Sequence, residues 1–361
     1  MEKVLILANM DIGLYKFRKE LIQELLKDNE VWISLPYGEL VEPLKEMGCH
    51  FINTDVDRRG VNPKKDLKLL WQYKKLIKKV NPDKVITYTI KPNIYGGVVC
   101  RWMRKPYFIN ITGLGTAFQT EGMLKKIITV MYRFACKRAK KVFFENKGNC
   151  CVMLENKIVK KSQAVLLPGA GVNVDEYQFE EYPDTENGYR FLFIGRIMQE
   201  KGIDELFAAA RKIRKERQDV FFDIVGPYED DYKSVVEKAE QENVITFHGY
   251  QEDVRPFIQA CHCFVLPSWH EGMANTLLES ASMGRPLITS DIHGCKEAVE
   301  ENKNGLLCPV QDSEELYKAI KRFLELDDAE KANWGRNSRE RMEKIFDKRK
   351  VVEKTISSMK K

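Results

Sequence analysis

The sequence predicts an α/β protein built from two doubly wound domains in tandem. Short apolar runs alternate with helical patterns along the chain, the alternation stops once in a polar stretch, and it then restarts. The length of 361 residues suits two domains, since a domain usually has about 100–200 residues. Strand–helix alternation implies parallel strands joined by right-handed crossovers.

The first domain is expected to span residues 1–168. A helix is predicted over Leu14–Leu26, where Leu14, Phe17, Leu21 and Leu25 recur at helical spacing. Seven short segments rich in Val, Ile, Phe or Tyr read as strands. They are Val4–Ala8, Val31–Leu35, His50–Thr54, Lys84–Thr89, Tyr107–Ile111, Lys141–Glu145 and Gln163–Leu167.

A linker is expected at residues 169–188, because Asp175–Gly188 is polar and acidic and has no periodicity. The second domain is expected at 189–340, followed by a charged helix at 341–361 that packs back on the first domain. Six strands are predicted in the second domain: Arg190–Ile194, Val220–Val225, Ile245–His248, Cys263–Leu266, Leu287–Thr289 and Gly305–Cys308. In such sheets ligands bind beyond the carboxyl ends of the strands, so we expect a site in a cleft between the domains.

Composition restricts the environment of the protein. The sequence has no run of about 18 apolar residues, so no transmembrane helix is expected. Met1–Leu7 leads directly into a strand pattern, which predicts no signal peptide. The nine cysteines form no disulfide framework and suit a reducing cytosol.

The net charge of +6 is divided unevenly along the chain. Residues 1–168 carry 31 basic and 16 acidic side chains, a net charge of +15, whereas residues 169–361 carry 28 and 37, a net charge of −9. The first half is therefore expected to face an anionic partner. The alternative is that the two domains attract each other.

Two segments carry the chemistry. In Leu266–Glu279 a predicted strand ends at Pro267, a tight loop carries Glu271 and Gly272, and a helix begins near Asn275. This arrangement places backbone N–H groups and a positive helix terminus where an anion or a sugar hydroxyl would bind.

In Phe191–Leu206 a strand runs into a loop with Arg196 and Lys201 and then into a helix. These two cations can neutralise a diphosphate. The segment lacks the G-x-x-x-x-G-K-[ST] pattern of a Walker loop.

Together, the Gly195-Arg196…Glu200-Lys201-Gly202 segment and the Glu271–Glu279 pair resemble the signatures of family 4 retaining glycosyltransferases. The resemblance implies the GT-B fold, with two Rossmann-like domains and the donor nucleotide-sugar bound mainly by the second. Three segments are similar to the capsular-polysaccharide branch, whose enzymes add N-acetylgalactosamine or another sugar to undecaprenyl-diphosphate-linked acceptors. These are Asn9–Lys19, Asp57–Pro63 and Tyr88–Gly97.

The resemblance implies a role for each matched residue. Arg196 and Lys201 would clamp the donor diphosphate and stabilise it as a leaving group. Glu271 would hold the hydroxyls of the donor sugar and Glu279 those of the ribose. The remaining donor-binding candidates are Gly13, Gly195, Gly272, Met273, Ala274, Asn275 and Thr276. Gly13 is expected in a loop that approaches the donor.

The acceptor side departs from the family pattern. The first loop has one glycine where members often have two, and Asn110–Thr116 has no histidine where many members carry one. The acceptor-side candidates are Lys91, Asn93, Asn110 and Thr112.

No metal site and no cofactor are expected. Asp55-Val56-Asp57 spells the D-x-D of metal-dependent transferases, but Arg58-Arg59 beside it would repel a divalent ion. Cys261-His262-Cys263 has no second ligand pair at zinc-finger spacing, so buried cysteines are expected there.

Two basic helices predict a membrane-facing surface. On a helix over Lys64–Val80, six lysines share one side, and Leu67, Leu69, Leu70, Tyr73, Leu76, Ile77 and Val80 share the other. The segment Leu124–Lys141 mixes basic and apolar residues in a similar way. Several such charges suffice for reversible docking to an anionic leaflet. The alternative is that the apolar sides pack on the sheet and the lysines are only solvated. No nucleic-acid-binding motif appears.

The sequence therefore predicts a metal-independent hexosyltransferase that uses a UDP-sugar and a lipid-linked glycan acceptor. It is expected to work in the cytoplasm, peripherally on the inner face of the membrane. Two alternatives stay open: an isomerase of the same fold that resembles UDP-GlcNAc 2-epimerase, and a non-catalytic binding module.

Overall fold

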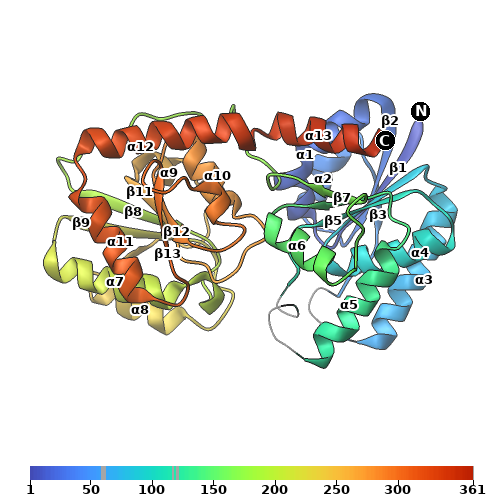
Figure 1. Ribbon diagram of the computed structural model, residues 1–361, viewed down its shortest axis with the longest axis horizontal. Helices are drawn as coiled ribbons and strands as arrows, with labels where there is room; N and C mark the ends of the chain where they lie inside the picture. The colour runs from blue at the N-terminus through green and yellow to red at the C-terminus, as the bar shows by residue number, and fades with distance from the viewer. Residues whose placement is uncertain (58–61, 116–117, 119–121, 361) are drawn as a thin grey trace. The chain divides into compact units, whose positions relative to one another are not determined.

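The computed structural model describes residues 1–57, 62–115, 118 and 122–360, which form two compact units. The first unit comprises Met1–Ala170 and Arg349–Lys361, and the second comprises Gly171–Lys348. Each is a parallel sheet with helices on both faces (Figure 1).

The first unit has a seven-stranded sheet in the order β3-β2-β1-β4-β5-β6-β7, with every pairing parallel. Its strands are β1 (Glu2–Leu7), β2 (Asn29–Leu35), β3 (His50–Asn53), β4 (Lys84–Tyr88), β5 (Tyr107–Ile111), β6 (Lys141–Phe144) and β7 (Ala164–Leu166). Its helices are α1 (Asp11–Asp28), α2 (Val41–Glu46), α3 (Pro63–Val80), a π-helix η1 (Pro92–Gly96), α4 (Gly97–Trp102), α5 (Met123–Cys136), α6 (Lys147–Glu155) and α13 (Lys348–Lys360).

Two apolar clusters lie on the two faces of this sheet. Helices α1, α2 and α13 contribute to one cluster, and α3, η1, α4, α5 and α6 contribute to the other. The helix α3 begins where Asn62 caps its first turn and Pro63 occupies its first position.

The second unit has a six-stranded parallel sheet in the order β10-β9-β8-β11-β12-β13 around one apolar cluster. Its strands are β8 (Tyr189–Ile194), β9 (Val220–Val225), β10 (Thr246–Phe247), β11 (Cys263–Leu266), β12 (Leu287–Ser290) and β13 (Gly305–Cys308). Its helices are η3 (Gln199–Lys201), α7 (Ile203–Glu216), α8 (Lys233–Gln241), α9 (Arg255–Ala260), α10 (Asn275–Ser282), η4 (Lys296–Ala298), α11 (Ser313–Glu325), α12 (Asp328–Arg341) and η5 (Met342–Phe346).

The predicted linker at 169–188 is wrong as a description of this segment, because residues 171–188 belong to the second unit. Val172 and Val174 are buried in its core. The fully buried Arg285 donates through its guanidinium to the backbone oxygen of Glu181 at 3.1 Å. The acidic side chains of the segment led to the linker prediction, but Arg285 binds the backbone carbonyl of Glu181. Composition does not reveal a contact of this kind.

The predicted boundaries near the end of the chain also need correction. Residues 341–348 lie in the second unit, where Met342 and Phe346 are buried. The segment that belongs to the first unit begins at Arg349 and packs through Val351 and Met359 against the cluster that includes α1.

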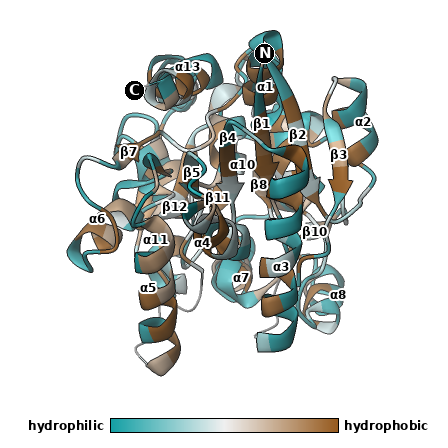
Figure 2. Ribbon diagram, turned by 90° about the vertical axis from the view of Figure 1, so that its right-hand side faces the viewer, coloured by the Kyte–Doolittle hydropathy of each residue, from teal (hydrophilic) through white to brown (hydrophobic). Residues whose placement is uncertain are grey.

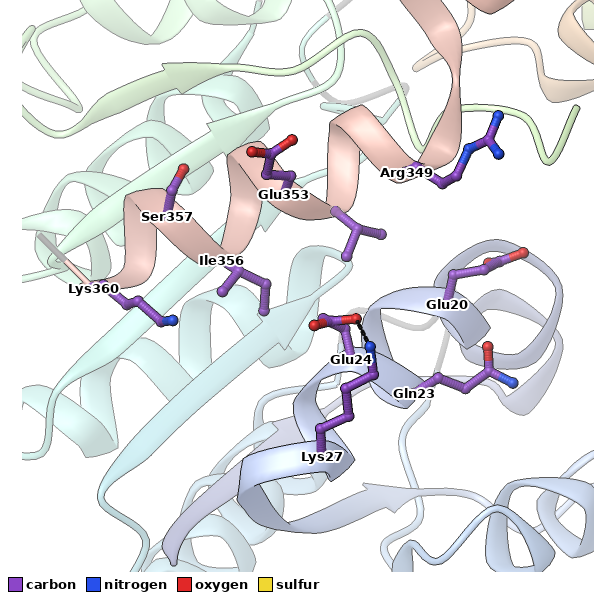
Figure 3. A pocket seen from close by; sticks show the side chains of 10 residues that line it. Glu20, Gln23, Glu24, Lys27, Arg349, Glu353, Ile356, Ser357 and Lys360 are labelled. Carbon is purple, nitrogen blue, oxygen red and sulfur yellow. Dashed lines mark hydrogen bonds and ion pairs between the residues drawn. The ribbon is translucent and has the colours of Figure 1, made fainter.

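A groove of about 540 Å³ runs between α1 and α13 in the first unit. Figure 3 shows Ile356 of α13 on one side and Glu20, Glu24 and Lys27 of α1 on the other, and Val352 of α13 also lines the groove. Glu24 pairs with Lys27 at 2.7 Å within the groove. None of the predicted site residues lines it.

Two apolar residues of α3 and several of α5 are not buried. On α3, Leu67 is exposed although its predicted position was on the packed side, and Trp71 is exposed among the lysines. On α5, Ile127, Val130 and Phe134 are exposed, whereas Tyr132, Ala135 and Cys136 face the core. The alternative interpretation, in which the apolar sides of both helices pack on the sheet, is therefore wrong for these positions.

Candidate active site

The candidate site lies at the carboxyl ends of β8 and β11, which are adjacent strands in the centre of the second sheet. The chain leaves β8 toward β9 on one side, and β11 leads to β12 on the other. Such a reversal of strand order opens a crevice where α/β proteins bind ligands. The two segments that the sequence singled out, Gly195–Lys201 and Pro267–Ala274, follow these two strands.

The loop after β8 turns sharply at Gly202. This residue has φ +72°, and a Cβ here would overlap the carbonyl oxygen of Pro267. Only glycine tolerates both conditions without strain. The loop that carries Lys201 thus lies directly against the loop that carries Glu271.

Further hydrogen bonds join the two loops. The backbone N–H of Trp269 donates to the carbonyl of Glu200 at 3.0 Å, and Nε2 of His270 lies 3.2 Å from the Glu200 carboxylate. The indole N–H of Trp269 donates to Glu205 at 3.2 Å. Because these contacts span both loops, the loops form one structural element.

Lys201 and Glu271 form an ion pair in which both side chains are mostly buried. The structure therefore brings the predicted cation and the predicted carboxylate into direct contact. Limited exposure to water strengthens the electrostatic effect of each group on a bound ligand.

A third loop, after β12, supports Glu271 from behind. Gly294 has φ +97°, and a Cβ here would lie 2.6 Å from the carbonyl oxygen of Glu271. The carbonyl of Gly294 accepts a hydrogen bond from Ala274 at 2.9 Å. His293 lies 2.8 Å from Glu297, so this segment forms a structural turn under the site.

Arg196 follows β8 and Glu279 lies on α10, and each has neighbours other than the Lys201–Glu271 pair. The guanidinium of Arg196 is 3.5 Å from Glu229, which follows β9, and the Arg196 side chain is 45% exposed. Glu279, on α10, lies close enough to Tyr177 that its charge adds to the effect of burial in raising the pKa of that phenol. The structure thus pairs Lys201 with Glu271, while Arg196 pairs with Glu229.

The amino end of α10 supplies polar groups to the site. Ala274 occupies the N-cap position and has no side chain able to cap the helix. The side-chain oxygen of Asn275 is buried and has no hydrogen-bond partner among the described residues. A buried polar atom usually finds a partner, so this oxygen and the helix terminus form a place for a hydrogen-bonding ligand.

Three acidic residues of the site had no predicted role: Glu200, Glu205 and Glu229. Burial raises the pKa of the Glu205 carboxyl. Glu200 stood within the quoted motif, so its position was available from the sequence. Glu205 also lies in the Phe191–Leu206 segment, but its partner Trp269 is far away along the chain, and Glu229 lies in neither of the two segments.

In the first unit, Gly13 lies in the first turn of α1 and not in a loop, because the helix begins at Asp11. A Cβ at Gly13 would meet only the Met10 side chain at 3.5 Å, which is an ordinary contact. The protein itself therefore does not require glycine here, and its role at the donor stays a prediction.

The acceptor-side candidates are largely engaged in the fold. Lys91 pairs with Asp66 at 2.7 Å. The buried amide of Asn93 accepts from the Thr87 hydroxyl at 2.7 Å and donates to the carbonyl of Asn110 at 2.8 Å, which fixes η1 to β4 and β5. Thr112 follows β5 and is half-buried. Their contact with an acceptor stays a prediction.

A buried ion pair that the sequence did not suggest joins Arg18 of α1 to Glu145, just after β6. The Arg18 guanidinium lies 5.1 Å from the ring centre of Tyr88, at the end of β4. A signal existed, since Arg18 shares helical spacing with the buried Leu14, Leu21 and Leu25.

The two motifs that resemble metal sites, Asp55–Asp57 and Cys261–Cys263, make contacts within the protein. Asp57 pairs with Lys65 at 3.1 Å, while Arg58, Arg59, Gly60 and Val61 lie outside the described residues, as does Thr116. Cys261 and Cys263 are free and buried, as predicted. His262 accepts from the N–H of Arg190 at 2.9 Å through Nδ1 and donates to the carbonyl of Asp184 at 2.8 Å through Nε2.

This geometry makes the stability of the second unit sensitive to pH. Burial lowers the pKa of His262 below its ordinary value, so the unfolded chain binds a proton more readily than the folded one. The stability present above about pH 6.5 should therefore fall as the pH is lowered through that value. We expect the melting temperature of His262→Asn to fall less between pH 7.5 and pH 5.5 than that of the wild-type protein. Equal losses in both proteins would contradict this prediction.

Comparison with known families agrees with this architecture. Residues 174–341 match the family described as "Glycosyl transferases group 1", and residues 3–146 match "Glycosyl transferase 4-like". Both halves of the chain are thus glycosyltransferase domains, and the chain belongs to the glycosyltransferases with the GT-B fold.

Two curated relatives indicate the relationship within this class. The chain is 26% identical, over 92% of both sequences, to the N,N'-diacetylbacillosaminyl-diphospho-undecaprenol α-1,3-N-acetylgalactosaminyltransferase of Campylobacter jejuni. It is 26% identical to an Escherichia coli UDP-Gal:α-D-GlcNAc-diphosphoundecaprenol α-1,3-galactosyltransferase, over 73% of this chain and 72% of that protein.

Solved structures support the fold. Anabaena HepE in complex with UDP and glucose superimposes with a TM-score of 0.82 at 16% identity, over all of both chains. The sucrose-phosphate synthase of Thermosynechococcus elongatus superimposes with a TM-score of 0.78 at 18% identity, over 99% of this chain and 98% of that one.

Proposed function

We propose that this chain is a retaining hexosyltransferase that moves a sugar from a UDP-sugar to an undecaprenyl-diphosphate-linked glycan during assembly of a bacterial surface polysaccharide. The observation that carries the proposal is the Lys201–Glu271 pair at the carboxyl ends of β8 and β11. The names of the two curated relatives support the lipid-linked acceptor.

In this proposal the reaction breaks the bond between the anomeric carbon and the UDP oxygen and forms a bond to the oxygen of an acceptor hydroxyl, whose proton passes to the departing diphosphate. Negative charge then develops on the departing diphosphate. Lys201 offsets this charge from the β8 loop, and Arg196 joins it. The pairing of Arg196 with Glu229 is half-exposed, and such pairs are worth only about 0–1 kcal/mol, so a diphosphate competes with it readily.

The acidic residues act on hydroxyl groups. Glu271 accepts hydrogen bonds from the donor sugar, and Glu279 from the ribose. The amides of the Gly272–Thr276 segment and the open Asn275 oxygen supply further hydrogen bonds. Retention follows from front-side attack or from a covalent intermediate.

We further propose that catalysis needs no metal ion, because the two cations Arg196 and Lys201 can together offset the diphosphate charge. The inner face of the cytoplasmic membrane is the proposed location. Among the described residues, no helix is both long enough and apolar enough to cross a bilayer. The first unit carries 36 basic and 17 acidic side chains, a net charge of +19, which attracts an anionic leaflet.

A screen of UDP-sugars with short-chain polyprenyl-diphosphate acceptors, read by mass spectrometry, tests the proposal. One UDP-sugar should raise the melting temperature, since a ligand that binds only the folded state stabilises it. The same sugar should be transferred, with turnover unchanged in EDTA. Loss of turnover in EDTA that Mn²⁺ restores would contradict the metal-independent mechanism. Conversion of the UDP-sugar without any acceptor would favour the isomerase instead.

A further inference from the structure

The outer side of α5 carries an apolar ridge that is exposed in the part of the chain that the structure describes. Met123, Ile127, Val130 and Phe134 recur at intervals of four, three and four residues, and they are 78%, 50%, 59% and 43% exposed. This spacing places all four on one side of the helix. The neighbouring Leu124 is also exposed.

The ridge is not the face that holds α5 to the protein. Tyr132, Ala135 and Cys136 are buried against the sheet on the other side of the helix. The helix is therefore apolar on two sides, of which only one is needed for folding. An exposed stripe of this kind is typical of an interaction surface.

Basic residues surround the ridge. Lys126 and Arg133 are exposed and lie beside it at helical spacing, and the Arg101 guanidinium stacks on the Phe134 ring at 3.9 Å. On α3, the exposed Leu67 and Trp71 stand among lysines, with the Lys74 ammonium 4.7 Å from the Trp71 ring. Apolar residues framed by Lys and Arg match the interface of an anionic bilayer, where the apolar groups enter the acyl boundary and the cations meet headgroups.

The two helices lie on the same face of the first sheet. Both pack into the apolar cluster that includes η1 and α4. Both helices contact α4, and Figures 1 and 2 show α3 and α5 extending in the same direction. Each follows a strand of a parallel sheet, so each begins at the carboxyl edge, which is the edge where ligands of such sheets bind.

We propose that the α5 ridge inserts into the lipid bilayer, with the basic α3 beside it at the headgroups. This inference deepens the proposed function by adding apolar insertion to the electrostatic attraction of the first unit. Insertion would hold the carboxyl edge of this sheet near the membrane surface, where the diphosphate of a lipid-linked acceptor lies. A protein partner is less suited to this surface, because interface cores are poor in lysine.

Co-sedimentation with vesicles of phosphatidylglycerol and phosphatidylcholine distinguishes insertion from adsorption. The unchanged chain should stay bound in about 0.5 M salt, where screening removes surface charge attraction. The variant Ile127→Gln/Val130→Gln should bind about tenfold more weakly at low salt and detach at high salt. The matched control is Ile345→Gln, which alters an exposed apolar residue of the second unit and should behave like the unchanged chain.

Complete release of the unchanged chain at high salt, or equal binding by the ridge variant, would overturn insertion. A dimer in analytical ultracentrifugation that the ridge variant abolishes would assign the ridge to self-association instead. The ridge variant and the Ile345→Gln control should melt at the same temperature as the wild-type protein, because all three substitutions are at exposed positions. Transfer to a short-chain acceptor should persist in the ridge variant. Absence of transfer in every protein would count against the proposed function and leave the vesicle result standing.

Discussion

Replacing Lys201 with methionine should lower kcat/KM for sugar transfer by about 10²–10³-fold. The substitution keeps most of the unbranched apolar stem and removes the ammonium group that faces Glu271. If Lys201 offsets charge that develops on the diphosphate, the loss should fall mainly on kcat, because that charge is greatest in the transition state. Steady-state kinetics with the UDP-sugar identified by the screen would measure it.

The chain offers a matched control on the next helix. Lys212 lies on α7, is half-exposed and pairs with Glu314 at the surface. Lys212→Met removes the same charge from the same unit and should leave kcat/KM within about twofold, since surface pairs contribute little. If both variants keep full activity, Lys201 has no catalytic role.

Replacing Gly202 with alanine should lower the free energy of unfolding by about 2–4 kcal/mol. Two penalties combine at this position: a left-handed backbone with φ +72°, and a Cβ that overlaps the carbonyl oxygen of Pro267. Relief of the overlap requires the β8 and β11 loops to separate, which would also move Lys201 away from Glu271. Chemical denaturation followed by circular dichroism would measure the loss, and activity should fall with it.

Gly249→Ala separates the two penalties. Gly249 has φ +65°, but a Cβ there would meet nothing within 4 Å. Its cost should therefore be only the backbone term, about 1–2 kcal/mol. Equal destabilisation by the two variants would show that the contact between the loops contributes nothing measurable.

The strands were the most predictable part of the fold. Each strand predicted from an apolar run is present in the structure, even the two-residue β10. Parallel strands buried on both faces are short and continuously apolar, so their signal is local. The 169–188 segment was misjudged because its attachment depends on Arg285, more than a hundred residues away.

The sequence could predict the part of the site that comes from its two motifs. Lys201 and Glu271 meet because each stands just after a strand, and β8 and β11 are neighbours. The partner of Arg196 was not predictable, because Glu229 follows a third strand and carries no motif. The α5 ridge was hidden for a different reason: periodicity shows that a helix has apolar residues, but not which of two apolar sides the sheet covers.

The return of residues 349–360 to the first unit has a consequence for biosynthesis. The α1 face of that unit stays open until Val351 and Met359 are made, almost two hundred residues after β7. At translation speeds of about 5–20 residues per second, this wait lasts roughly 10–40 s. The second unit, by contrast, is contiguous in the chain and can mature first on the ribosome. During synthesis the first unit would then depend on chaperones. A protein truncated before residue 349 should aggregate through the exposed apolar surface of α1.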